Sequence, residues 1–185
     1  MLRPLEMAHQ FLAEVIGPED LVVDATMGNG HDTLFLAKRA GQVVAFDIQE
    51  EALLHTGTRL EEAGLSNVTL VHEGHEKVDQ YVDQVKAAIF NLGYLPAADK
   101  SVITRADTTL TAIEKLLERL ELGGRMAIMV YYGHEGGPEE KDAVLDFVRS
   151  LPQKEITVAI YQTINQVNKP PFLIMLEKLK EYNHG

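Results

Sequence analysis

The chain of 185 residues contains no cysteine, and it has no long uninterrupted apolar run. Without cysteine there are no disulfides, no thiolate metal ligands and no cysteine nucleophile. No apolar stretch approaches the about 20 residues that a membrane-spanning helix needs. Glu6 and Glu14 interrupt the N-terminal segment, where a signal peptide would be continuously apolar. The sequence therefore predicts a cytoplasmic protein with no membrane association.

Basic residues are also scarce, with 17 Lys and Arg against 28 Asp and Glu and a formal net charge of −11. This balance argues against a protein that coats nucleic acid non-specifically, because phosphate binding requires a basic surface. A local basic patch remains compatible with it. The length, the hydrophobic content of 45% and the lack of repeats or linkers predict one domain over residues 1–185.

Apolar spacing and glycine or proline breaks divide the chain into alternating elements. Helices are expected at 4–16, 31–40, 49–63, 75–83, 101–120 and 137–150. Strands are expected at 21–23, 43–46, 68–71, 87–90 and 125–132, followed by two consecutive strands within 155–179, at 155–164 and 171–179. The alternation predicts an α/β fold with a mainly parallel seven-stranded sheet, helices on both faces and an antiparallel C-terminal hairpin.

A glycine-containing loop at residues 24–30 joins the first strand to the next helix. In doubly wound sheets, ligands bind at this position. Asp47 ends the second strand about 20 residues later, where a carboxylate accepts hydrogen bonds from ribose hydroxyls. The third glycine of a dinucleotide-binding loop is replaced by Thr33, and the loop has no Lys or Arg. A nucleoside ligand without phosphate is therefore favoured over NAD.

Several segments together resemble one family. They are Asp24-Ala25-Thr26-Met27-Gly28-Asn29-Gly30-His31-Asp32-Thr33, Phe46-Asp47-Ile48-Gln49, Gly74-His75-Glu76, Asn91-Leu92-Gly93-Tyr94-Leu95-Pro96, Tyr131-Tyr132-Gly133-His134-Glu135-Gly136-Gly137 and Asn168-Lys169-Pro170-Pro171-Phe172. The chain is similar to a small bacterial family of class I S-adenosylmethionine methyltransferases, with a Rossmann-like fold, long labelled putative rRNA methylases. That family is now associated with methylating the aminomethyl group of 5-aminomethyl-2-thiouridine at the tRNA wobble position.

The resemblance implies S-adenosyl-L-methionine as the cofactor and tRNA, through its anticodon region, as the partner. The cofactor contacts that it implies lie at Met27, Gly28, Asn29, Gly30, Asp47, Gln49, His75 and Glu76. His75 and Glu76 have a second interpretation, as the first turn of a helix, where an acidic residue complements the helix dipole.

The reaction site is expected where the fourth strand ends, at Asn91 and Tyr94. Amino-methylating enzymes often carry Asn-Pro-Pro-aromatic there, and this chain has Leu-Gly in place of Pro-Pro, which leaves room for a flexible aminomethyl group. Asp24 and His134 are candidates for removing the amine proton. Alternatively, Asp24 orients the cofactor amino group and His134 packs in its loop.

Basic residues that could meet tRNA phosphates are Arg3, Lys100, Arg105 and Lys169. The seven histidines show no metal-binding spacing, so no metal site is predicted. A homodimer that shares the RNA-binding surface is compatible with the sequence. Two alternatives stay open: an rRNA or small-molecule methyltransferase, and a non-catalytic nucleotide-binding module.

Overall fold

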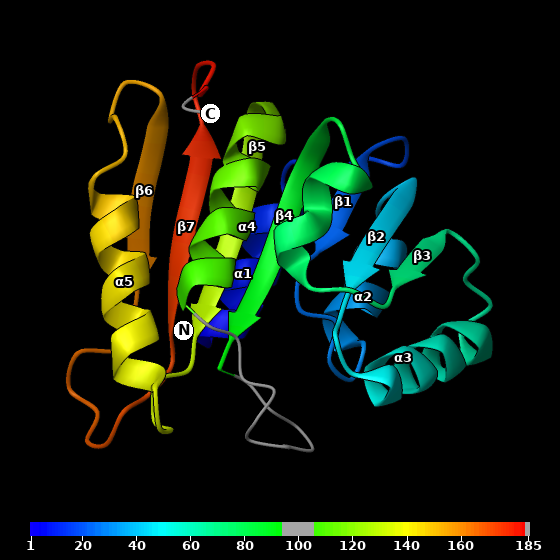
Figure 1. Cartoon of the computed structure of the whole chain (residues 1–185), viewed down its shortest axis with the longest axis horizontal. Coiled ribbons are helices and arrows are strands. Elements are labelled where there is room, and N and C mark those ends of the chain that lie inside the picture. Colours follow the sequence, from blue (N-terminus) through cyan, green and yellow to red (C-terminus); the bar gives the residue numbers. More distant parts are fainter. Residues whose placement is uncertain (94–105, 184–185) are drawn as a thin grey trace.

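The computed structural model describes residues 1–93 and 106–183, and its centre is a twisted seven-stranded sheet in the order β3-β2-β1-β4-β5-β7-β6 (Figure 1). The strands are β1 (Leu21–Asp24), β2 (Gln42–Phe46), β3 (Val68–Val71), β4 (Val85–Leu92), β5 (Leu120–Val130), β6 (Ile156–Tyr161) and β7 (Phe172–Lys178). The first five strands run parallel, and β7 is antiparallel to both β5 and β6. The predicted fold class is confirmed.

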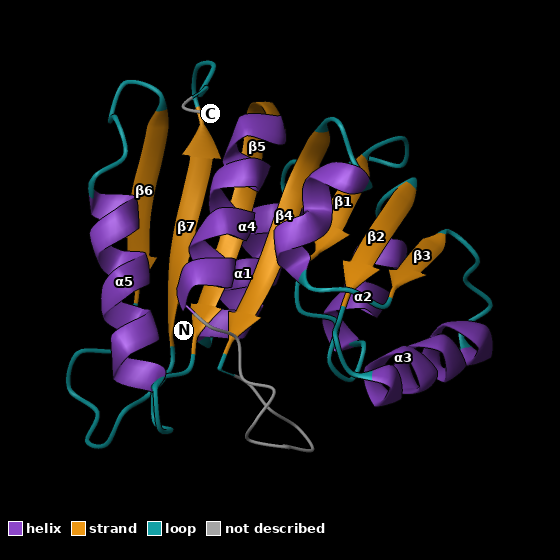
Figure 2. Cartoon of the chain, in the orientation of Figure 1, coloured by secondary structure: helices purple, strands orange, loops and turns teal. Residues whose placement is uncertain are grey.

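Helices cover both faces of the sheet (Figure 2). The elements are α1 (Pro4–Ala13), α2 (His31–Ala37), α3 (Glu50–Glu62), the 3-10 helix η1 (His75–Gln80), α4 (Ala106–Arg119) and α5 (Gly137–Arg149). One face packs against η1, α4 and α5 around a core that includes Phe90 and Ile128. The opposite face packs mainly against α1 and α2, with Leu60 of α3 in the same cluster. The central parallel strands are therefore buried on both faces, whereas the edge strand β6 is partly exposed.

Apolar periodicity explains why these segments form helices. In α4 the buried residues recur at the spacing of one helix face, at Thr109, Ala112, Ile113, Leu116 and Leu117. The central strand β4 is apolar without alternation because it is covered on both faces. The pattern of apolar residues thus predicts both whether a segment is a helix or a strand and which of its residues are buried.

Several predicted boundaries differ in detail from the structure, and α2 and η1 each end three residues before the predicted positions 40 and 83. The first helix ends at Ala13 rather than at 16, because its last turn tightens through a bond from Val15 N to Leu12 O, three residues apart. Strand β5 begins at Leu120 rather than 125, and it accommodates Gly123, with φ of 80°, in an irregular pairing with β4. Strand β6 stops at Tyr161 rather than 164.

The antiparallel hairpin returns to the edge where the parallel strands end. Val130 of β5 pairs with Phe172 of β7, and Leu173 pairs with Tyr161 of β6. The β6–β7 connection therefore lies at the same edge as the loops that follow β1, β4 and β5 (lower edge in Figure 1). Ligands of doubly wound sheets bind at this edge.

A fully buried lysine fastens the last strand to α4. The Nζ of Lys178 donates hydrogen bonds to the carbonyl oxygens of Leu117, at 2.8 Å, and Glu118, at 3.0 Å. Both carbonyls belong to the last turn of α4, where the helix leaves them without partners. The buried ammonium thus acts as the C-terminal cap of α4.

We expect Lys178→Met to lower the free energy of unfolding by about 1–3 kcal/mol, because two buried carbonyls lose a charged donor. Urea unfolding at neutral pH measures this change. The matched control is Lys180→Met, at an exposed position two residues away, which should change stability by less than about 0.5 kcal/mol. Equal effects of the two substitutions would contradict the capping role.

Within the described residues, no helix combines the length and the apolar character needed to cross a membrane.

Candidate functional site

The loop after β1 is held by backbone hydrogen bonds to the strands on either side. Ala25 N donates to Ile89 O of β4 at 2.9 Å, and Met27 N donates to Phe46 O of β2 at 2.9 Å. The loop therefore sits where the sheet order reverses between β1 and its two neighbours. It then runs directly into α2, whose N-cap is Gly30.

Asp47, at the end of β2, joins the loop to the next helix. Its Oδ2 accepts a hydrogen bond from Gly28 N at 3.0 Å, and its Oδ1 accepts one from Gln49 N at 2.9 Å. Gln49 is the N-cap residue of α3. The side chain is partly exposed, so the carboxylate keeps acceptor capacity for a ligand beside the loop.

Helix α3 holds the loop from the other side. The Nε of Arg59 donates to Asn29 O at 2.9 Å, and Thr56 Oγ1 donates to Gly28 O at 3.3 Å. Gly30 has a φ of 86°, and a Cβ there would lie 2.7 Å from Thr56 Oγ1. The loop's own sequence has no basic residue, but Arg59, 30 residues away, brings a guanidinium to it, and sequence reasoning missed this contact.

The Asp24 carboxylate is fully buried beneath the loop. It accepts hydrogen bonds from Thr33 Oγ1 at 2.6 Å and from Thr26 N at 3.2 Å. The residue that replaces the third glycine therefore ties the start of α2 to the end of β1. The catalytic role of Asp24 stays a prediction, and in this conformation the side chain contacts the loop rather than the surface.

Burial, and next the neighbouring Asp32 carboxylate, raise the pKa of Asp24 to about 7, although the hydrogen bonds from Thr33 and Thr26 lower it. In the unfolded chain the group titrates near 3.9. Between about pH 4 and pH 7 the folded protein holds a proton that the unfolded chain has lost, so this group makes stability fall as pH rises through that window.

We therefore expect Asp24→Asn to flatten the decline in stability between about pH 4 and pH 7. Denaturant unfolding of both proteins across this range gives the comparison, and the difference in slope isolates Asp24 from other titrating groups. Parallel curves for the two proteins would contradict the raised pKa.

The predicted cofactor residues differ in their burial and in their contacts with the loop after β1. His75 is buried, and its Nδ1 lies 3.1 Å from Ala25 O, which holds η1 against the loop; burial lowers the pKa of His75. Glu76 lies in the first turn of η1, partly exposed. The Met27 side chain points into the core with Ala45 and Ala52, so only its backbone remains available to a ligand.

The predicted reaction residues lie at the ends of β4 and β5. Asn91 is partly exposed, and its backbone N donates to Thr26 Oγ1 at 2.7 Å, which joins it to the loop after β1. Gly93, with φ of 79°, lets the loop after β5 approach closely, because a Cβ there would overlap His134 and Tyr131 O. Tyr94 lies outside the described residues.

His134 carries a buried Nε2 that has no hydrogen-bond partner among the described residues. A buried polar atom without a partner is uncommon in folded proteins. The ring lies beside Gly93, the first residue after β4, which is the strand that carries Asn91. The structure thus brings the end of β4, which carries Asn91, next to the loop that carries His134, two residues that are predicted from separate motifs.

Two polar residues next to Asn91 were missed by the sequence reasoning. The Nδ2 of Asn91 donates to Asp32 Oδ2, and Asp32 Oδ1 lies 2.6 Å from His9 Nε2. Asp32 is 5% exposed, in the first turn of α2. His9 lies on the same face of α1 as the partly buried Leu5 and the buried Leu12, and a polar residue on this apolar face is the signal that could have identified it.

The predicted RNA contacts are divided between described and undescribed parts of the chain. Arg3 is exposed at the start of α1 and pairs with Glu6 at 2.5 Å. Lys169 is exposed in the β6–β7 connection, at the strand edge where the loops gather. Lys100 and Arg105 lie outside the described residues.

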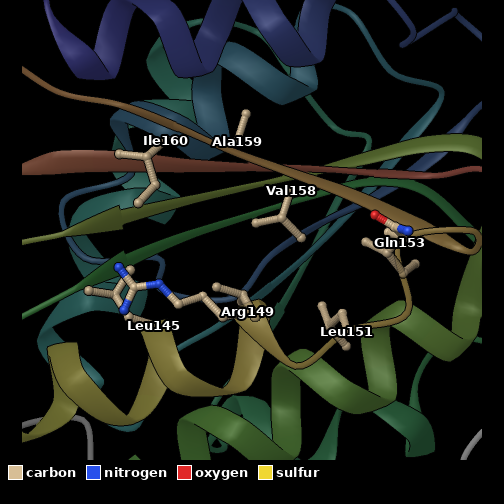
Figure 3. A pocket seen from close by; sticks show the side chains of 9 residues that line it. Leu145, Arg149, Leu151, Gln153, Val158, Ala159 and Ile160 are labelled. Carbon is tan, nitrogen blue, oxygen red and sulfur yellow. The ribbon is translucent and has the colours of Figure 1, made fainter.

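A metal site and a surface groove were also considered as functional sites. Among the described residues, no group of three or more His, Cys, Asp or Glu side chains is arranged to hold a metal ion. A groove of about 340 Å³ lies between α5 and the edge strand β6, lined by Leu145, Arg149, Val158 and Ile160 among others (Figure 3). It contains none of the predicted site residues.

Comparison with known proteins gives a family match. The family model described as putative rRNA methylase matches residues 43–177. A curated relative, the chloroplastic tRNA (mnm(5)s(2)U34)-methyltransferase of Arabidopsis thaliana, is 37% identical over 188 residues. That alignment covers 94% of this chain and 69% of the relative.

Solved structures agree over nearly the full chain. A putative methyltransferase from Streptococcus mutans, in complex with SAH, is 55% identical with a TM-score of 0.93. A putative rRNA methylase from Clostridium thermocellum is 42% identical with a TM-score of 0.94. Each comparison covers 97% of this chain and 99% of the other.

Proposed function

The chain belongs to the putative rRNA methylase family and is an S-adenosylmethionine-dependent methyltransferase, and from this we propose that it methylates the aminomethyl group of wobble 5-aminomethyl-2-thiouridine in tRNA. The observation that carries the substrate proposal is the relative from Arabidopsis thaliana, whose name specifies that modification and which aligns with 94% of this chain. The expected product is the methylaminomethyl group.

The loop after β1 fits the cofactor. Gly28 and Gly30, both with positive φ, bring the backbone close to a ligand, and the partly exposed Asp47 carboxylate is an acceptor for two ribose hydroxyls. Gly30 is also the N-cap residue of α2, so the first backbone amides of that helix lie beside the loop. When bound, S-adenosylmethionine supplies an electrophilic methyl group.

The chemistry of the chain favours a nitrogen nucleophile. The sequence has no cysteine, so the covalent adduct usually needed for methylation at C5 of a pyrimidine cannot form. Asn91 presents a neutral amide at the end of β4, and an amide oxygen accepts a hydrogen bond from an amine. An amine attacks a methyl group directly, and most of the rate then comes from holding the two in line.

An alkylamine is mostly protonated at neutral pH, so it must lose a proton before it attacks. We propose that Asn91 holds the amine and that the unpartnered Nε2 of His134 accepts this proton. Asn91 lies near the end of β4 and His134 lies on the loop after β5, both at the edge where the parallel strands end. The aromatic ring of Tyr94 is proposed to stack on the base.

The net charge of −11 favours a small RNA contact rather than a broad one. Arg3 and Lys169 lie near the edge of the sheet where the parallel strands end. Lys100 and Arg105 follow Asn91 in the sequence. We propose that these four residues contact phosphates of the anticodon region.

Nucleoside mass spectrometry of tRNA from a strain lacking the protein tests the proposal. The methyl on the wobble aminomethyl group should disappear, and the unmethylated aminomethyl nucleoside should accumulate. The family description favours rRNA as the second candidate, so purified protein with labelled cofactor is also given bulk tRNA or ribosomal subunits. An unchanged tRNA profile with label in ribosomal RNA would replace the tRNA proposal with the rRNA one.

A further inference from the structure

We propose that Asp32 is a positioning residue that fixes the Asn91 side chain with its oxygen toward the substrate amine, and that His9 holds Asp32 in place. The inference rests on the proposed function, in which Asn91 binds the amine. It is carried by a chain of contacts that joins α1, α2 and β4. The chain runs from His9 Nε2 to Asp32 Oδ1, at 2.6 Å, and from Asp32 Oδ2 to Asn91 Nδ2.

The contact with Asp32 decides which way the Asn91 amide faces. An asparagine amide has a donor end and an acceptor end of nearly the same shape, and its orientation follows from its hydrogen-bond partners. An ionised carboxylate can only accept, so the NH₂ end of Asn91 must face Asp32. The Oδ1 end is then directed away from Asp32.

This orientation matters for attack on a methyl group. An amine attacks through its lone pair, so its N–H bonds must be held by acceptors that leave the lone pair pointing at the methyl. With Oδ1 toward the substrate, Asn91 is such an acceptor. With the amide reversed, its NH₂ would point at the amine and compete for the same lone pair.

His9 limits the movement of Asp32. Its ring stacks on Phe35, with centroids 3.9 Å apart and an interplanar angle of 12°. Phe35 lies on α2, one turn after Asp32, so the imidazole is held by the same helix that carries the carboxylate. Asp32 is 5% exposed, and water therefore competes little for either of its hydrogen bonds.

The backbone of Asn91 is held independently of Asp32. Its N–H donates to Thr26 Oγ1 at 2.7 Å, and β4 pairs with β5 at this position. Loss of Asp32 therefore releases the side-chain amide without moving the strand. Asp32 and Asn91 should act as one unit in catalysis.

A double-mutant cycle tests this unit. Single-turnover methyl transfer to tRNA that carries the aminomethyl group is measured at saturating cofactor for Asp32→Ala, Asn91→Ala and the double variant. We expect Asp32→Ala to lower the transfer rate at least about tenfold, and the double variant to match Asn91→Ala alone. Losses that multiply in the double variant would overturn the proposal.

Two further variants separate positioning from folding. Asp32→Asn can still accept from Asn91 and donate to His9, so it should recover part of the rate that Asp32→Ala loses. His9→Phe keeps the stacking on Phe35 but removes the hydrogen bond, and it should lower the maximal rate without changing the apparent KM for tRNA. The matched control is His55→Phe, at an exposed position of α3, which should leave the rate of methyl transfer unchanged.

A measurement without substrate completes the test. The side-chain amide signal of Asn91, assigned by its loss in Asn91→Ala, is followed by NMR in the cofactor-bound protein. Asp32→Ala should shift this signal, and Asp146→Ala, at an exposed site on α5, should not. If wild-type protein transfers no methyl to the tRNA, the proposed function fails and this signal alone decides the positioning role. An unshifted signal in Asp32→Ala would overturn it.

Discussion

Replacing Asp47 with alanine is expected to raise the Kd for S-adenosylmethionine about a hundredfold or more. A carboxylate that accepts two ribose hydroxyls contributes two charge-assisted hydrogen bonds, each worth about 1.5–3 kcal/mol. The same substitution removes the acceptor for Gly28 N and Gln49 N, so the loop after β1 also loses its link to the start of α3. Isothermal titration calorimetry with cofactor and with its demethylated product measures the loss.

Two controls make the Asp47 result specific. Asp47→Asn keeps the shape and one acceptor oxygen but loses the charge, so its affinity should lie between those of the wild type and Asp47→Ala. Asp146→Ala, on the exposed side of α5, should bind the cofactor normally. Unchanged affinity in Asp47→Ala, with the protein folded by circular dichroism, would remove Asp47 from the cofactor site.

Asn91→Ala is expected to retain cofactor affinity while its rate of methyl transfer falls by about 10²–10³-fold. Removing one group that holds the reacting atoms typically has an effect of this size on kcat. The cofactor loop should stay in place, because its bond to position 91 uses the backbone N–H and Thr26 Oγ1 rather than the side chain.

Calorimetry for the cofactor and single-turnover transfer to aminomethyl-bearing tRNA separate the two properties of this variant. A parallel loss of affinity and rate would mean that the substitution disturbs the loop instead of the amine site. Full transfer activity would show that Asn91 does not hold the nucleophile.

Local sequence patterns predicted the sheet because each element carries its own signal. The continuous apolar run of β4 and the helical spacing of α4 depend only on neighbours in the chain. The start of β5 was predicted five residues too late, because Gly123 and Gly124 suggest the end of a helix. In the structure the strand includes both glycines and pairs irregularly with β4.

The site was only partly predictable because its contacts join distant segments. The cofactor loop and Asp47 were predicted from motif spacing. The alternative hypothesis of a non-catalytic nucleotide-binding module is wrong, because the chain belongs to a methyltransferase family. Asp32 and Arg59 gave no local signal of this kind, and His9 gave only its position on the apolar face of α1. Asn91 lies 59 residues from Asp32 in the sequence, and only the parallel order of β1 and β4 brings them together.

The position of β7 has a consequence for how the protein is made. This strand follows β5 and β6 in the sequence, yet it lies between them in the sheet. While the chain grows on the ribosome, β5 exposes an unpaired edge until residues 172–178 emerge, and such an edge can pair with other chains. The final residue of β7 is Lys178, which also completes the end of α4. Completion of the sheet and of α4 therefore waits until residues 172–178 have been synthesised.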